Sequence, residues 1–216
     1  MEKLTLYDYL GFIVPGGLVL ATIVYGFDLA SFREAPASTG MVLLAAAAFV
    51  IGHLNAAIAN YLQSAAWGKK PGTRLPSSTG LFGKRGLHEE PAQQGIEQDF
   101  ERQFPQGQDF QQRFDLGYTL LRQKKLDTSA QIMNQQLGFY RNTSASVLVS
   151  LLIVTVAAFT GHNTLDWWLW LPVGLVAEAL LIFRFRRFWV RFGNEIIRGV
   201  QAYQSAPSGS EESPPT

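Results

Sequence analysis

Four stretches of the chain are apolar and almost free of charged residues. A helix needs about 20 largely apolar residues to cross the hydrocarbon core of a bilayer, with a usual range of ~17 to 25. The first stretch contains one charged residue, Asp28, the fourth contains Glu178, and the other two contain none. The pattern therefore predicts four membrane spans, at residues 9–30, 40–63, 144–161 and 167–183.

The long segment between the second and third spans divides into two parts. Residues 64–91 are rich in Gly, Pro and Ser, which is typical of a flexible linker. Residues 92–143 carry apolar side chains at helical intervals, interrupted by Pro105 and Gly107. A further helix is expected to start at Asp127-Thr128-Ser129 and to continue as the third span up to Gly161. The apolar positions of the helical part are Ile96, Phe100, Phe104, Phe110, Phe114 and Leu121.

The fourth span is predicted to continue as an amphipathic helix over residues 185–204, followed by a disordered tail at 205–216. Its apolar side needs a partner, which could be the third-span helix, the loop helices or a second subunit. We expect it to form a small helical cytoplasmic domain with residues 92–143. The fold class is thus an all-α polytopic membrane protein, with transmembrane hairpins at 9–63 and 144–184.

The basic residues are distributed unevenly along the chain. Residues 64–143 hold 11 of the 18 Lys and Arg residues, and the segment after Phe183 holds five more. The short connections after the first and third spans together hold one, Arg33. Because cytoplasmic segments carry an excess of basic residues, both termini and the long loop are expected in the cytoplasm.

The first apolar stretch has a second interpretation as a signal peptide cleaved after Ala37. Its N-terminal region contains only Lys3 as a basic residue, offset by Glu2 and Asp8, and its apolar stretch is longer than usual for a signal peptide. We therefore favour a retained span.

Composition narrows the possible functions. Only 16% of the residues are charged, against about 25% in typical soluble proteins, because the spans are nearly free of charge. The absence of cysteine excludes a disulfide scaffold and a cysteine-based metal or redox site. A net charge of +1 gives no electrostatic reason to expect nucleic acid. We find no metal-binding, cofactor-binding or catalytic motif, so neither a cofactor nor an enzymatic activity is expected.

Polar side chains within the spans are the best functional candidates, because such groups are costly in a bilayer without partners. Asn55 lies in the inner half of the second span, near His53 and Asn60, which share one helix face. With Glu178 they could form a polar cluster that faces a pore, a proton path or a subunit interface. They could instead hydrogen-bond to each other and only fix the packing of the helices, which is the interpretation that we favour.

Small residues and a proline suggest where helices approach or bend. Ala48, Gly52 and Ala56 are spaced by four, so they form a small-residue ridge that could contact a neighbouring span or another chain. The triplet Pro15, Gly16 and Gly17 predicts a kink or short break in the first span, as a tolerated structural feature or as a hinge.

Basic residues flank the spans on the predicted cytoplasmic side, where anionic lipid headgroups would attract them. They are Lys69, Lys70, Lys84, Arg85, Arg184, Arg186 and Arg187.

Three segments carry a resemblance to known proteins. The opening 6–16 (LYDYLGFIVPG), residues 137–142 (LGFYRN) and residues 183–188 (FRFRRF) resemble uncharacterised small bacterial membrane proteins with four spans. The resemblance implies a location in the bacterial inner membrane. Some similar small multi-span proteins are anti-phage defence effectors that disrupt membranes.

These observations favour a non-enzymatic, oligomeric inner-membrane protein. We expect it to receive a signal molecule or soluble partner on its cytoplasmic domain and to alter membrane permeability, as a defence effector would. The main alternative is a membrane anchor or scaffold for a soluble partner. A small-solute transporter or an intramembrane enzyme is a further alternative, but we find no internal repeat to support transport.

Overall fold

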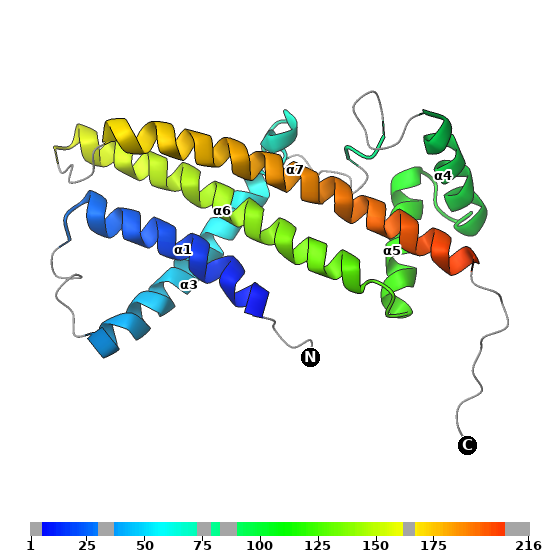
Figure 1. Ribbon diagram of the computed structural model, residues 1–216, viewed down its shortest axis with the longest axis horizontal. Coiled ribbons are helices and arrows are strands. Elements are labelled where there is room, and N and C mark those ends of the chain that lie inside the picture. Colours follow the sequence, from blue (N-terminus) through cyan, green and yellow to red (C-terminus); the bar gives the residue numbers. More distant parts are fainter. Residues whose placement is uncertain (1–5, 30–36, 73–78, 83–89, 162–166, 206–216) are drawn as a thin grey trace, which may run out of the picture. The chain divides into compact units, whose positions relative to one another are not determined.

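A computed structural model describes residues 6–29, 37–72, 79–82, 90–161 and 167–205 (Figure 1). Within these ranges the chain forms helices and contains no β-strand. The helices are α1 (Leu6–Gly26), α3 (Ala37–Leu62), the short 3-10 helix η1 (Ala65–Trp67), α4 (Glu90–Gln103), α5 (Phe110–Gln123), α6 (Thr128–Phe159) and α7 (Trp167–Ser205).

Three segments of the described chain are long and apolar enough to cross a membrane: Gly40–Trp67, Thr128–Phe159 and Trp168–Ser205. The apolar part of α1, Leu10–Gly26, is shorter. The prediction of an all-α chain with apolar, membrane-length helices is therefore confirmed.

The chain divides into two compact units, which we describe separately. Unit 1 comprises residues 1–75 and 134–188, and unit 2 comprises residues 76–133 and 189–216. Helices α6 and α7 each contribute to both units.

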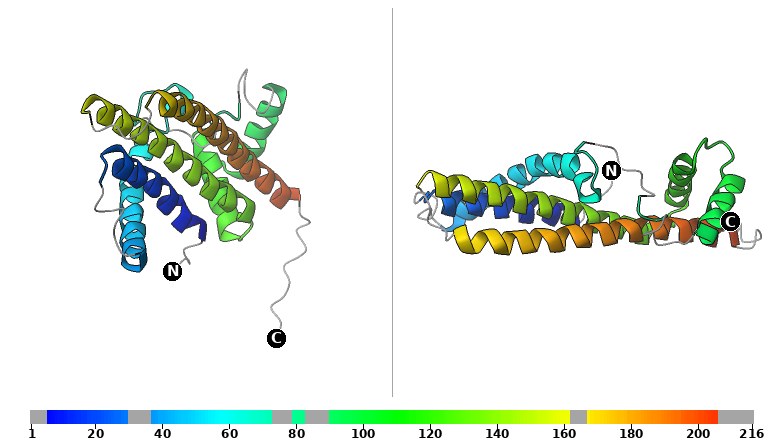
Figure 2. Two further views of the ribbon diagram at one scale, coloured as in Figure 1. Left: turned by 60° about the vertical axis from the view of Figure 1, so that its left-hand side comes forward. Right: turned by 90° about the horizontal axis from the view of Figure 1, so that it is seen from above.

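In unit 1, α1 crosses α3 at two glycines (Figures 1 and 2). A Cβ atom on Gly16 would lie 1.8 Å from the backbone oxygen of Ala48, and one on Gly52 would lie 2.1 Å from that of Phe12. Only glycine permits such a close approach of two helix backbones. The ridge predicted from Ala48 and Gly52 thus contacts a neighbouring helix of the same chain.

Helices α6 and α7 run side by side through unit 1 (Figures 1 and 2). Gly174 of α7 makes room for Leu151 of α6, because a Cβ atom there would lie 2.4 Å from Leu151 Cδ2. The ring of Tyr140 stacks on that of Phe188, with 5.2 Å between their centroids. The two long helices are therefore packed along this part of their length.

Unit 2 has its own apolar core, formed by α4, α5, the start of α6 and the end of α7. Most of the apolar residues that recur at helical intervals in α4, α5 and the end of α7 are buried in this core. Their burial explains why these amphipathic helices pack together. The buried members are Leu81, Ile96, Phe100, Phe104, Phe114, Leu121, Ala130, Ile196, Ile197 and Val200. Phe110 and Phe192 are partly buried against this core.

Two described residues within the predicted flexible linker, 64–91, pack against the core of unit 2. Leu81 is fully buried in the core of unit 2, and the ring of its neighbour Phe82 packs edge-on against Phe110. Gly and Ser dominate the composition of the segment, but burial of this apolar pair stabilises the position of the two residues in unit 2.

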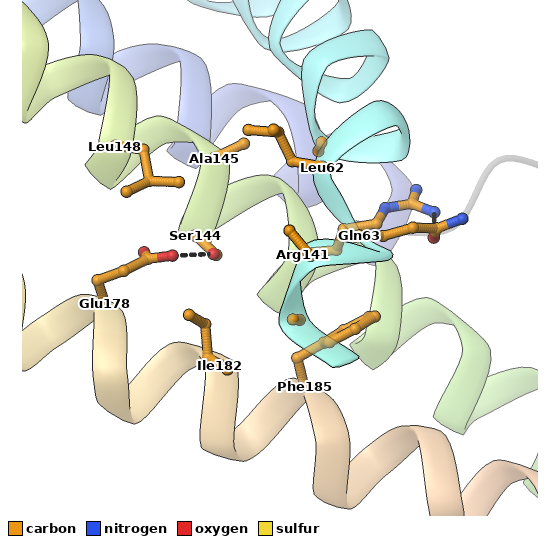
Figure 3. A pocket seen from close by; sticks show the side chains of 12 residues that line it. Leu62, Gln63, Arg141, Ser144, Ala145, Leu148, Glu178, Ile182 and Phe185 are labelled. Carbon is orange, nitrogen blue, oxygen red and sulfur yellow. Dashed lines mark hydrogen bonds between the residues drawn. The ribbon is translucent and has the colours of Figure 1, made fainter. Parts of the chain in front are cut away.

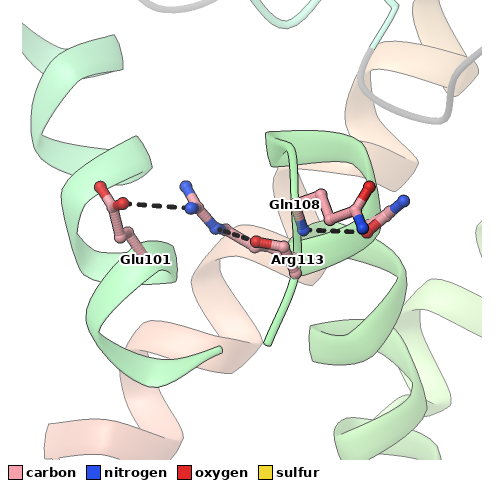
Figure 4. Close-up of polar contacts among 5 residues, drawn as sticks. Glu101, Gln108 and Arg113 are labelled. Carbon is pink, nitrogen blue, oxygen red and sulfur yellow. Dashed lines mark hydrogen bonds and ion pairs between the residues drawn. The ribbon is translucent and has the colours of Figure 1, made fainter. Parts of the chain in front are cut away.

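Polar contacts join α4 to α5 in unit 2 (Figure 4). Arg113 donates to Glu101 Oε1 of α4 and to the backbone oxygen of Gly107, at 3.1 Å in each case. The carboxylate of Asp109 accepts from the backbone N–H of Gln112 at 2.8 Å, so it caps the N-terminus of α5. These bonds define the turn that Pro105 and Gly107 were predicted to make.

Candidate functional site

Asn55 is the centre of a buried polar group that joins three helices of unit 1. Its side-chain amide donates to the backbone oxygen of Asn142 at 2.7 Å and to the hydroxyl of Ser146 at 2.8 Å, both on α6. Asn142 and Ser146 in turn donate to α1. All three side chains are buried, so their hydrogen bonds hold α1, α3 and α6 together in an apolar environment.

The bonds from α6 to α1 compensate for Pro15. A proline has no backbone N–H, so the carbonyl of Gly11, one helical turn earlier, loses its usual donor. The side-chain amide of Asn142 donates to this carbonyl at 3.0 Å, and the Ser146 hydroxyl donates to the Pro15 carbonyl at 2.9 Å. Helix α1 accordingly continues through Pro15, without the short break that the sequence allowed.

Glu178 of α7 is a buried carboxylate in unit 1. Its Oε1 accepts a hydrogen bond from the hydroxyl of Ser144 on α6, at 2.6 Å. Its Oε2 is buried and has no hydrogen-bond partner among the described residues. A carboxylate in an apolar helix is costly unless it is paired, protonated or solvated, so this side chain marks a candidate site.

A cavity of about 150 Å³ lies beside Glu178 and is bounded by α3, η1, α6 and α7 (Figure 3). Its polar lining residues are Gln63, Arg141, Ser144 and Glu178. The other lining residues are small or apolar: Ala59, Leu62, Ala65, Ala66, Ala145, Leu148, Ile182 and Phe185. The cavity therefore combines an apolar wall with a few convergent polar groups, which is the usual composition of a binding site.

Arg141 brings the opposite charge to the same cavity. Its guanidinium donates to Gln63 Oε1 at 3.4 Å rather than to Glu178, and its Nε atom is buried without a partner in the described structure. Arg141 and Ser144 are three residues apart on α6, so they lie on one face of that helix. The cavity lining thus contains a carboxyl residue and an arginine without a direct ion pair between them.

The structure does not bring together the cluster predicted from His53, Asn60 and Glu178. His53 is exposed on α3, where its ring packs against Phe12 and Phe49 and its Nδ1 lies 3.2 Å from the Phe49 carbonyl oxygen. Asn60 is exposed as well. Helical spacing predicted that His53 and Asn60 share one face of α3, but it could not show that the cavity is lined instead by the face that carries Ala59, and that Asn55 bonds to α6.

Ser144, Arg141 and Gln63 are site residues that the sequence did not reveal. Serine and glutamine are common side chains, and Arg141 was counted only among the basic residues of the loop. A signal was nevertheless present, because Arg141 and Ser144 stand one turn apart where the third span begins.

The basic residues predicted to face lipid headgroups are exposed wherever the structure describes them. Lys69, Lys70, Arg184, Arg186 and Arg187 are exposed, whereas Lys84 and Arg85 lie outside the described residues. The guanidinium carbon of Arg186 lies 5.1 Å from the centre of the Trp67 ring, in a cation–π arrangement.

A larger cavity of about 370 Å³ lies between α1, α6 and α7 of unit 1. Its lining is almost entirely apolar, and two of its few polar side chains, Thr22 and Ser150, hydrogen-bond to each other at 3.1 Å. Within the described ranges, no group of three or more His, Asp or Glu side chains is placed to hold a metal ion. The cavity beside Glu178 is therefore the stronger candidate for a functional site.

The fold and the site define an all-α protein with apolar, membrane-length helices and a polar cavity among them. Comparison of the chain with models of known families, with curated proteins and with solved structures gives no match.

Proposed function

We propose that this chain is a four-span integral membrane protein of the bacterial inner membrane, with both termini in the cytoplasm. Helix α1 has 21 residues and is thus about 32 Å long, close to the ~30 Å of the hydrocarbon core. Its close packing on α3 and its bonds from Asn142 and Ser146 support a retained span rather than a cleaved signal peptide.

Unit 2 is the cytoplasmic domain in this proposal. Helices α6 and α7 have 32 and 39 residues, about 48 and 58 Å, so each is longer than the hydrocarbon core is thick. Their additional length contributes to the separate apolar core of unit 2. A domain that shares helices with the spans is well suited to pass a binding event on to the membrane unit.

The function that the site supports best is a non-enzymatic change of membrane permeability. The protein assembles as an oligomer, and binding of a signal molecule or soluble partner to unit 2 triggers the change. The carrying observation is the polar cavity beside Glu178, because ionisable groups inside a membrane mark ion and proton pathways. The resemblance is to uncharacterised membrane proteins, and because some similar proteins are anti-phage defence effectors, we take infection as the physiological trigger.

A flux assay in vesicles tests this proposal. Purified protein reconstituted into liposomes should release an entrapped ion or collapse an imposed potential when a cellular extract supplies the trigger, and Glu178→Gln should reduce the rate. Leu152→Ala, which changes an exposed residue of α6 that does not line the cavity, is the matched control and should conduct like the wild type. Wild-type protein that leaves the potential intact, with and without a cellular extract to supply the trigger, would contradict the proposal.

A second candidate function is that of a membrane anchor for a soluble partner. The observation that favours it is the buried polar group of Asn55, Asn142 and Ser146, because both amide nitrogens and the hydroxyl are used in hydrogen bonds that join three helices. An anchor should co-purify with a defined partner through unit 2 and leave the membrane potential unchanged.

A further inference from the structure

We propose that the cavity beside Glu178 is a water-filled vestibule in which the Glu178 carboxyl binds and releases a proton. The inference rests on the proposed location of unit 1 in the membrane, and it names the proton as the species that the site takes.

The two carboxylate oxygens of Glu178 have different environments. Oε1 is held by the Ser144 hydroxyl at 2.6 Å, whereas Oε2 has no donor among the described side chains. The side chain is only 6% exposed, and it extends from α7 towards Ser144 across the cavity (Figure 3). One oxygen therefore fixes the position of the group, and the other is available to a proton or to water.

Arg141 is the other charged residue of the cavity lining. The walls from α3, η1 and α7 contribute no ionisable side chain besides Glu178 itself. Because the Arg141 guanidinium bonds to Gln63 and points away from Glu178 (Figure 3), it does not neutralise the carboxylate through a direct contact. A proton and water can satisfy both groups, since water donates to a carboxylate and accepts from a guanidinium.

The size and position of the cavity fit this role. A volume of about 150 Å³ is room for several water molecules, each of which takes ~30 Å³ in the liquid. One wall is made by Gln63, Ala65 and Ala66, where α3 ends and η1 begins, close to Trp67 and the exposed Lys69. Tryptophan and lysine are typical of the polar boundary of a membrane, so the cavity lies at the level where water enters.

The chemistry is a simple proton transfer. A hydronium ion in the vestibule gives its proton to the Glu178 carboxylate and becomes water, and the reverse step returns the carboxylate to its ionised form. The Ser144 hydroxyl keeps its proton throughout and holds the carboxyl in place, so Ser144 is a positioning residue.

Modification by dicyclohexylcarbodiimide tests the proton-binding step. This apolar reagent reacts with protonated carboxyls: a carboxyl oxygen bonds to the carbodiimide carbon, and the proton moves to a carbodiimide nitrogen. We expect Glu178 of the detergent-solubilised full chain to be modified, increasingly as the pH falls, and Glu178→Gln to lose that adduct in mass spectrometry.

Cysteine accessibility tests the presence of water independently. The chain contains no cysteine, so single-cysteine variants have no background. We expect Ala145→Cys, at the cavity wall, to react with a small water-soluble methanethiosulfonate at least tenfold faster than Leu152→Cys. Leu152 is 64% exposed and, in the proposed topology, faces lipid.

Two results would overturn the proposal. In the first, the carbodiimide modifies other carboxyls of the folded wild-type protein but does not modify Glu178 at any pH. The other is an Ala145→Cys variant that reacts no faster than Leu152→Cys. A failure of the liposome flux assay alone would contradict the proposed permeability function and leave the proton site standing, because neither labelling experiment depends on conduction.

Discussion

At the scale of single residues, polar side chains in the apolar helices act by satisfying specific backbone and side-chain atoms. Asn142 provides the clearest case, since its amide replaces the donor that Pro15 removes from the Gly11 carbonyl. The proline is therefore tolerated in α1 because Asn142, 131 positions after Gly11, provides the missing hydrogen bond.

This pairing predicts a non-additive effect of two substitutions. Asn142→Leu should destabilise the protein by about 1–2 kcal/mol, because the Gly11 carbonyl loses its donor. Pro15→Ala restores a backbone N–H at position 15, so Asn142→Leu should cost less when it is made in a Pro15→Ala background. Thermal unfolding in detergent of the wild type and the three variants measures the coupling. If Asn142→Leu destabilises the protein equally in the wild-type and Pro15→Ala backgrounds, the Asn142 hydrogen bond does not compensate for Pro15.

Individual candidate residues were only partly predictable. The sequence identified Glu178 and Asn55, because charged and amide side chains stand out in an apolar run. Their partners Ser144, Asn142 and Ser146 were missed, since those residue types are common and the pairs lie 34 to 91 positions apart. Such contacts depend on how helices are rotated against each other, which helical periodicity does not specify.

At the scale of elements, the approach of α1 to α3 depends on one of two adjacent glycines. A Cβ atom on Gly16 would collide with the backbone of α3, whereas one on Gly17 would have nothing within 4 Å. Substituting each glycine with alanine therefore distinguishes two effects on stability. The effect of helix propensity is similar at both positions, whereas the effect of helix packing is expected only at Gly16.

Gly16→Ala should destabilise the protein by about 2–3 kcal/mol or more, since backbone atoms of two helices must move apart. Gly17→Ala is the matched control and should be neutral or stabilising by up to ~1 kcal/mol, because alanine favours the helix. Unfolding temperatures in detergent provide the comparison. Similar losses for both variants would contradict the close crossing.

The elements themselves were largely predictable. The apolar runs and the helix start at Thr128 are local features of the sequence, and the structure contains them. The burial of Leu81 was not predictable in the same way, because it depends on a core assembled from α4, α5 and α7. Composition describes a segment as a whole, whereas one buried apolar pair can determine where it lies.

At the scale of the whole molecule, the chain combines an apolar helical unit with a second unit that has an independent core. Phe100 is fully buried in the core of unit 2, so Phe100→Ala should destabilise that unit by about 3–5 kcal/mol. Limited proteolysis should then cleave residues of unit 2 faster, while the protein stays in the membrane fraction.

Leu126→Ala is the control for that experiment, because Leu126 is an exposed residue of unit 2. It should leave the cleavage pattern unchanged. Loss of Phe100→Ala from the membrane fraction would indicate that the membrane unit cannot fold without unit 2.

The central claim is that α1 and α3 both cross the membrane and that unit 2 lies in the cytoplasm. Sidedness of cysteine labelling tests it directly, because the chain has no native cysteine. A membrane-impermeant maleimide should label Gln106→Cys in unit 2 only in inside-out vesicles. It should label Leu29→Cys, after α1, only in right-side-out vesicles. Labelling of both positions from the same side would contradict the four-span account.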